Sequence, residues 1–144
     1  MAPVTFTVKF IGRPSPPTKL KVNGEEPDGE ILLYNSSRQI VGEEANGEST
    51  AAFIVSTFTD APKSSIASGI YYFQGTILGK KGHFSATLGG PTNYPIISAH
   101  FEIIPETTGG ELKGLTGKGW YELDVSEPHD RKDGRPITFS VELP

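Results

Sequence analysis

The sequence predicts an all-β protein, with residues 1–144 forming a single closed eight-stranded antiparallel up-and-down barrel domain. Three observations predict this fold class. Val, Ile and Thr, which favour strands, outnumber Ala, Leu and Met, which favour helices. Gly and Pro make up about a fifth of the 144 residues, a density typical of many short turns. Apolar and polar residues alternate in short runs at roughly hairpin spacing, without a convincing helical stretch.

The first half of the chain begins with the clearest strand. Residues 4–10 alternate apolar and polar side chains, as in a strand with one buried face. The run ends at residues 12–17, where three prolines remove backbone donors. Further short strands are expected at residues 19–22, 30–35 and 39–43, with an acidic turn at residues 23–29 and another turn at Ser36 and Ser37.

The second half contains the longer expected strands, at residues 49–59, 69–78, 83–88, 96–104, 119–125 and 137–143. Residues 79–82 form a tight glycine-flanked hairpin link, and residues 89–93 form the next turn. Residues 107–119 are expected to be a compact loop that packs Leu112 and Leu115 against the mouth of the barrel. A charged loop is expected at residues 128–136.

A sheet with eight or nine strands must close or stack to avoid exposed edges. The regular, meander-like spacing favours a closed barrel over the alternative, a Greek-key sandwich. A barrel of about eight strands has room in its interior for one small ligand.

Composition excludes several classes of protein. Because the chain has no Cys, it has no disulfide scaffold, thiolate nucleophile, cysteine zinc site or iron–sulfur cluster. A net charge of −4 argues against a nucleic-acid-binding surface. No apolar run is long enough to span a membrane, and the N-terminal residues lack the pattern of a secretory leader. We therefore expect a cytoplasmic protein without nucleic-acid or membrane partners.

Motifs for metals and phosphates are weak. The three histidines, His83, His100 and His129, lack the spacing of metal ligands. Residues 114–119 are glycine-rich, but a strand follows them, whereas a phosphate-binding loop leads into a helix. We expect neither a metal nor a cofactor.

Aromatic residues fall on neighbouring expected strands. If Gly75, Phe84 and Phe101 face inward, strand alternation places further residues on the same face. These are Tyr71, Phe73, Ile77, Ala86, Leu88, Ala99 and Ile103. Such a mixture of large aromatic, small and hydroxyl-bearing side chains is typical of a small-molecule pocket. The alternative is an ordinary packed core whose Tyr hydroxyls reach water at the barrel end.

Several segments resemble a known family. Residues 75–84 resemble the G-T-x-x-G-x-x-G-x-F hairpin of small allene-oxide-cyclase-like barrels, in particular a large uncharacterised and mainly bacterial family among them. Residues 101–105 are similar to that family's aromatic-x-V-V-P strand, and residues 5–9 to its opening strand. Residues 109–122 resemble its G-x-G-E-L-x-G-L-x-G-x-G-x-F/Y-E signature.

This resemblance implies a calycin-like barrel with an apolar central cavity, often assembled as a homodimer or homotrimer. It also implies ring closure on a reactive polyene or epoxide without a cofactor, through the shape of the cavity and a few well-placed dipoles. The chain departs from the pattern because Ala52 and Tyr71 stand near positions where the family has acidic residues. Residues 4–10 also lack the carboxylate of the plant enzymes. We therefore expect a neutral cavity with tyrosine hydroxyls.

The functional hypothesis is a cofactor-independent cyclase or isomerase of natural-product biosynthesis that acts on a small hydrophobic metabolite, with a pericyclic ring closure as one form of the reaction. Tyr71 and Tyr121 would polarise or orient the substrate. The side chains that shape the cavity would be Phe73, Phe84, Leu88, Phe101 and Ile103. One alternative is a non-catalytic, lipocalin-like binder or carrier of a small hydrophobic ligand. Another is a structural or interaction protein with a closed core.

Overall fold

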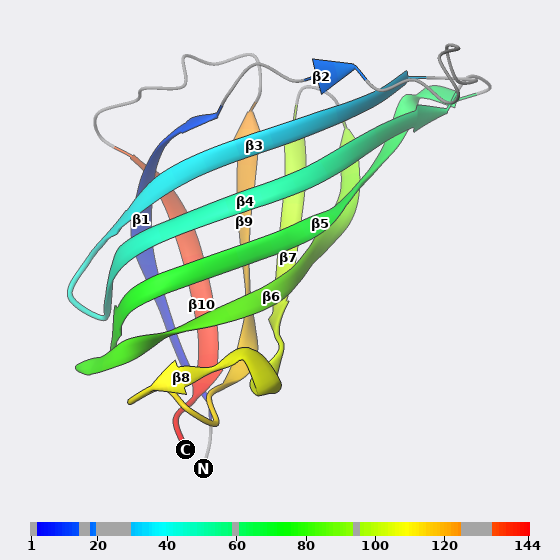
Figure 1. Ribbon diagram of the computed structural model, residues 1–144. Helices are drawn as coiled ribbons and strands as arrows, with labels where there is room; N and C mark the ends of the chain where they lie inside the picture. Colours follow the sequence, from blue (N-terminus) through cyan, green and yellow to red (C-terminus); the bar gives the residue numbers. More distant parts are fainter. Residues whose placement is uncertain (1–2, 15–17, 20–29, 59–60, 94–95, 125–133) are drawn as a thin grey trace.

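The computed structural model describes residues 3–14, 18–19, 30–58, 61–93, 96–124 and 134–144. Eight strands form the body of the molecule (Figure 1): β1 (Val4–Pro14), β3 (Glu30–Val41), β4 (Ala45–Phe58), β5 (Ala61–Ile77), β6 (Lys80–Asn93), β7 (Ile96–Ile103), β9 (Thr116–Asp124) and β10 (Arg135–Glu142). Two short strands, β2 (Thr18–Lys19) and β8 (Gly109–Gly110), pair with β3 and β6. A 3-10 turn, η1, covers Pro105–Thr107. Within the described residues, no helix is long and apolar enough to cross a membrane.

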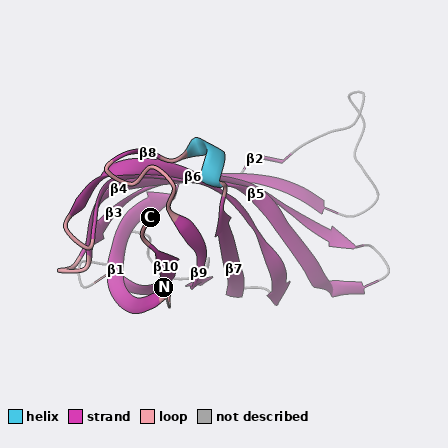
Figure 2. Ribbon diagram, turned by 90° about the horizontal axis from the view of Figure 1, so that it is seen from below, coloured by secondary structure: helices cyan, strands magenta, loops and turns pink. Residues whose placement is uncertain are grey.

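The sheet closes on itself through β1. Residues 4–10 of β1 pair with β10, and residues 9–14 pair with β3, so the one strand joins both edges. Around the barrel the order is β1, β10, β9, β7, β6, β5, β4, β3 and back to β1, with every pair antiparallel. The predicted all-β, closed, eight-stranded up-and-down barrel is thereby confirmed. Figure 2, a view from below, shows β1 curling tightly around one side of the barrel.

Two predicted turns are wrong because the chain continues through them as strand. Ser36 and Ser37 lie within β3, where they pair with Ala51 and Thr50 of β4. Residues 89–93 lie within β6, where Gly89 pairs with Ser68 of β5. Serine and glycine are common in turns, but here strands on both sides supply the backbone hydrogen bonds, so the chain has no need to reverse.

Other expectations fall wholly or partly outside the described residues. The acidic turn at residues 23–29 lies outside them, as does most of the charged loop at residues 128–136. Of the expected strand at residues 19–22, only Lys19 is described, and it belongs to β2. The first strand is longer than predicted, since β1 continues through Gly12 to Pro14 where it pairs with β3.

The lower end of the barrel is closed by the segment between β7 and β9. Leu112 and Leu115 are both fully buried, as predicted, although residues 116–119 of the predicted loop belong to β9. The hydroxyl of Thr107 accepts a hydrogen bond from the backbone N–H of Ser85 at 2.8 Å and so fastens the segment to β6. Both chain termini lie at this end, near β8 (Figure 1).

Replacing Leu112 by Ala tests how firmly this segment closes the barrel. We expect the free energy of unfolding to fall by about 2–5 kcal/mol, because a fully buried leucine is truncated in a well-packed site. The exposed neighbour Lys113 gives the matched control, and Lys113→Ala should change stability by less than about 0.5 kcal/mol. Urea denaturation measures both variants. Equal effects would show that the loop does not pack on the barrel.

Candidate functional site

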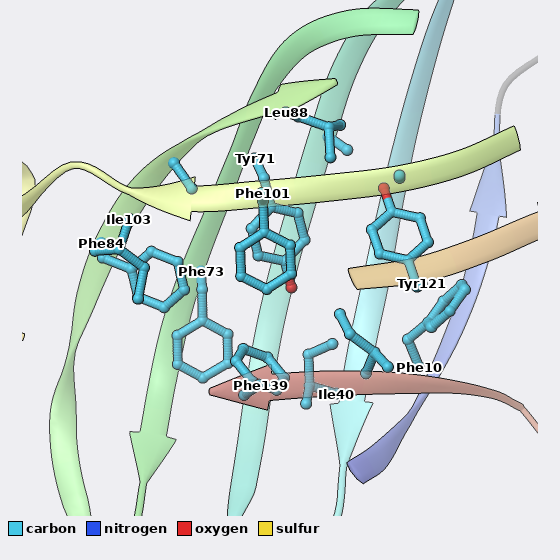
Figure 3. Packing of buried hydrophobic residues seen from close by; sticks show 14 of the residues in the cluster. Phe10, Ile40, Tyr71, Phe73, Phe84, Leu88, Phe101, Ile103, Tyr121 and Phe139 are labelled. Carbon is cyan, nitrogen blue, oxygen red and sulfur yellow. The ribbon is translucent and has the colours of Figure 1, made fainter. Parts of the chain in front are cut away.

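All seven residues predicted for the site face the interior of the barrel. Tyr71, Phe73 and Phe84 are fully buried, and the others are at most 4% exposed: Leu88, Phe101, Ile103 and Tyr121. They come from β5, β6, β7 and β9, as strand alternation predicts (Figure 3). The inward face is therefore correctly placed, while the roles of these residues stay a prediction.

Aromatic rings fill one part of the interior. The rings of Tyr71 and Phe101 stack with centroids 4.7 Å apart. Those of Phe73 and Phe84 stack at 5.4 Å, and Phe139 of β10 meets Phe101 edge to face at 5.5 Å. At these separations the rings are in contact, so here they pack on one another (Figure 3). Phe139 also belongs to this group, although it is not among the residues predicted from the sequence.

An arginine lies among these apolar side chains. Arg38 is 5% exposed, and the alternation of β3 turns it inward between Ser36 and Ile40. Its guanidinium carbon lies 4.4 Å from the centre of the Tyr121 ring and 4.9 Å from that of Phe10. At these distances both rings attract the cation.

Two local features position this arginine. Its Nε donates a hydrogen bond to the Ser36 hydroxyl at 2.6 Å. Gly12 pairs with Arg38 across the junction of β1 and β3, and a Cβ at Gly12 would lie 2.6 Å from the Arg38 Cγ. Glycine at this position therefore leaves the space through which the arginine side chain passes.

Several polar atoms near Arg38 lack a partner. They are the two terminal nitrogens of Arg38 and the hydroxyls of Ser49, Tyr71 and Tyr121. Each is buried and has no hydrogen-bond partner among the described residues. Ser49 pairs directly with Arg38 across β3 and β4. We refer to Arg38, Ser49, Tyr71 and Tyr121 as the Arg38 cluster.

Buried polar atoms without hydrogen-bond partners lower the free energy of unfolding, so a core that serves only stability would not favour them. An unsatisfied buried hydroxyl costs roughly 1–3 kcal/mol, and an unpaired buried charge costs more. Most buried polar groups in native proteins have partners, and exceptions often mark functional positions. The Arg38 cluster is therefore the candidate functional site.

Burial has the largest effect on the ionisation of Tyr71. Burial raises the pKa of the Tyr71 hydroxyl far above its usual value. The nearby Ser49 and Arg38 lower this pKa and Tyr121 raises it, without reversing the effect of burial. Ser49 is near enough to act on Tyr71, although the two hydroxyls do not meet with hydrogen-bonding geometry. Tyr71 thus keeps its proton at neutral pH and can donate it in a hydrogen bond.

The expectation of a neutral interior is wrong. Arg38 brings a guanidinium, which is a cationic group, into the interior. No aspartate or glutamate is among the buried side chains of the described residues. Sequence reasoning missed this cation because it placed a turn at Ser36 and Ser37, which interrupts the alternation. Continuous alternation of Tyr34, Ser36, Arg38 and Ile40 is the signal that identifies it.

Several open grooves in the described part of the molecule lie on the outside of the barrel, and one of about 560 Å³ has Arg38 and Ser49 among its lining residues. Another groove of about 480 Å³ runs over β7, β9 and β10, where His100, Trp120 and Glu122 contribute to its walls. Nowhere in the described ranges do three or more potential metal-ligating side chains gather. His129 lies outside these ranges.

The fold and the Arg38 cluster define the class of this protein: a small up-and-down β-barrel with a cationic centre in an aromatic interior. The chain belongs to the DUF3224 family, described as proteins of unknown function, whose model matches residues 21–132. The resemblance to allene-oxide-cyclase-like barrels is not confirmed by this match and stays a prediction.

A solved structure gives the same architecture. It is a DUF3224 protein of unknown function from Shewanella oneidensis MR-1, 19% identical to this chain, with a TM-score of 0.75. The similarity covers 99% of this chain and 98% of that one. At this level of identity, the likeness shows the fold alone. No curated protein matches the chain.

The raised pKa of Tyr71 makes stability depend on pH in the alkaline range. In the unfolded chain a tyrosine ionises near pH 10, whereas burial keeps Tyr71 protonated in the folded protein. Its contribution is therefore complete below about pH 10 and falls above it, by up to about 1.4 kcal/mol per pH unit. Urea denaturation between about pH 10 and pH 12 should show a shallower decline for Tyr71→Phe than for the unmodified protein. If stability falls equally with pH in both proteins, the Tyr71 hydroxyl is exposed to water rather than buried.

Proposed function

We propose that this protein binds one small, mostly apolar organic molecule in the interior of its barrel, beside the Arg38 cluster. The observation that carries the proposal is the group of buried, unpartnered polar atoms on Arg38, Ser49, Tyr71 and Tyr121 within an otherwise apolar wall. Ligand sites are typically apolar with a few convergent polar groups, and eight-stranded barrels can hold one small ligand.

Small inward residues support a place for the ligand next to the cluster. Ala99 of β7 pairs with Tyr121 of β9, and Ala51 of β4 pairs with Tyr71 of β5. Both alanines are buried, so they keep the wall thin beside the two tyrosines. The stacked rings of Tyr71 and Phe101 bound this region on one side. They provide a flat apolar surface for the body of the ligand.

A neutral fluorescent probe, N-phenyl-1-naphthylamine, tests this proposal. We expect saturable binding, with about one probe per chain and the blue-shifted emission of an apolar site. Ala99→Phe should weaken binding about tenfold or more, since the new ring projects into the interior. Fluorescence titration measures both affinities.

The neighbouring Ser98→Phe is the matched control, because Ser98 lines the outer groove. It should bind the probe as the unmodified protein does. A cooperative unfolding transition checks the fold of each variant. Non-saturable binding to the unmodified protein, or equal effects of the two variants, would contradict interior binding.

A second candidate is turnover by a cofactor-independent cyclase or isomerase. One observation favours it: the guanidinium of Arg38 and the hydroxyls of Tyr71 and Tyr121 are buried in the interior and have free hydrogen-bonding capacity among the described residues. Fixed donors of this kind stabilise negative charge that develops on a substrate oxygen. A buried carboxylate base is not found among the described residues. The arrangement therefore suits a ring closure or rearrangement that depends on a held conformation and a polarised oxygen.

If the protein is an enzyme, removal of the Tyr71 hydroxyl should greatly slow the reaction. A compound extracted from the purified protein and its isomers would be incubated with enzyme and followed by NMR, since isomers share one mass. Tyr71→Phe should slow the conversion about 100-fold, the effect of losing one donor to a developing oxyanion. Tyr72→Phe is the control, because the hydroxyl of Tyr72 bonds to Gln74 at an exposed position. If neither the compound nor its isomers are converted, turnover is contradicted and binding remains as the proposed function.

A further inference from the structure

Arg38 carries a charge that the described residues of the barrel leave uncompensated. The guanidinium is 5% exposed, and the buried side chains of the described residues include no carboxylate. Phe10 and Tyr121 attract the cation through their rings but satisfy none of the N–H groups on its terminal nitrogens. A buried charge is stable when it has both a counter-charge and hydrogen bonds.

The free part of the guanidinium has a defined geometry. Nε is occupied by the Ser36 hydroxyl, whereas both terminal nitrogens lack partners. These two nitrogens form a planar fork, which matches the two oxygens of a carboxylate in a bidentate pair. The two terminal nitrogens of Arg38 are therefore positioned to bind a carboxylate.

The three hydroxyls of the Arg38 cluster favour the same kind of partner. The hydroxyls of Tyr71, Tyr121 and Ser49 are each able to donate a hydrogen bond, and none has a hydrogen-bond partner among the described residues. Donors that surround a cation favour an anion over a neutral amide or an amine. A single guanidinium neutralises a single negative charge, so a dianion such as a phosphate monoester would bring an uncompensated charge into the interior.

We infer that the Arg38 cluster is an anion site and that the molecule bound in the barrel is an organic monocarboxylate with an apolar body. Its carboxylate pairs with the two terminal nitrogens of Arg38 and accepts hydrogen bonds from the hydroxyls of Tyr71 and Tyr121. Its apolar body lies against the surrounding rings and alanines. This inference rests on the proposed function, because it names the chemical class of the interior ligand.

A matched set of probes tests the charge of the ligand: 2-naphthoate, its neutral amide 2-naphthamide, and the cation 2-naphthylmethylammonium. Each is measured by calorimetry and by displacement of N-phenyl-1-naphthylamine. We expect 2-naphthoate to bind at least about 30-fold more tightly than the amide, the lower end of the effect of unpairing a buried charge. The cation should not bind measurably.

Variants assign the preference to Arg38. Arg38→Met keeps an apolar side chain of similar length, and it should lose the preference for 2-naphthoate while still binding the neutral naphthylamine probe. Arg38→Lys keeps the charge but not the fork, and it should show an intermediate preference. Lys118→Met, at an exposed position of β9, removes one charge from the surface and should leave the preference unchanged. Thermal unfolding checks that each variant is folded.

The outcomes separate this inference from the proposed function. Equal binding of 2-naphthoate and 2-naphthamide, with the neutral naphthylamine probe still bound, would overturn the anion site and leave interior binding intact. A preference for 2-naphthoate that persists in Arg38→Met would also overturn it. Failure of every probe to bind would overturn interior binding and the anion site together.

Discussion

The arrangement of the interior depends on one contact, a buried guanidinium between two aromatic rings. Arg38 reaches its position only because the barrel closes: β1 brings Gly12 and Phe10 beside β3, and β9 brings Tyr121 from farther around the barrel. The cation–π contacts and the bond to Ser36 offset part of the cost of burial. The two terminal nitrogens of Arg38 have no partner among the described residues, so they can donate hydrogen bonds to a bound molecule.

The interior combines two environments with different consequences. The rings of Phe73, Phe84, Phe101 and Phe139 pack closely and bury a large apolar surface, which stabilises the barrel. The Arg38 cluster lowers stability, since its polar atoms are buried without partners among the described residues. A fold with a small net stability retains such a cluster where it serves another role, as strained or unsatisfied groups at functional sites often do.

The sequence was sufficient to predict which side chains of β5 to β7 face inward, but it did not reveal the buried charge of Arg38. Alternation from Gly75, Phe84 and Phe101 correctly predicts seven buried neighbours on β5 to β7, because side chains point to opposite faces with a strict period of two. The buried Ala67 and Ile97 were not among the predicted residues. The turn assigned to Ser36 and Ser37 hid Arg38, since local composition carries no information about the strands that pair on either side. The position of Phe10 and Gly12 beside Arg38 comes from the closure of the barrel, a pairing between distant segments.

The chemistry of the site requires that the guanidinium of Arg38 is enclosed in the barrel and held against Phe10 and Tyr121. The most direct measurement is the side-chain NMR signal of Arg38, assigned by its loss in Arg38→Lys. We expect an Nε–Hε proton that exchanges slowly with water at neutral pH, because it is buried and bonded to Ser36. The two rings should shift the side-chain protons of Arg38 upfield. A rapidly exchanging signal at the position of a solvated arginine would contradict both expectations.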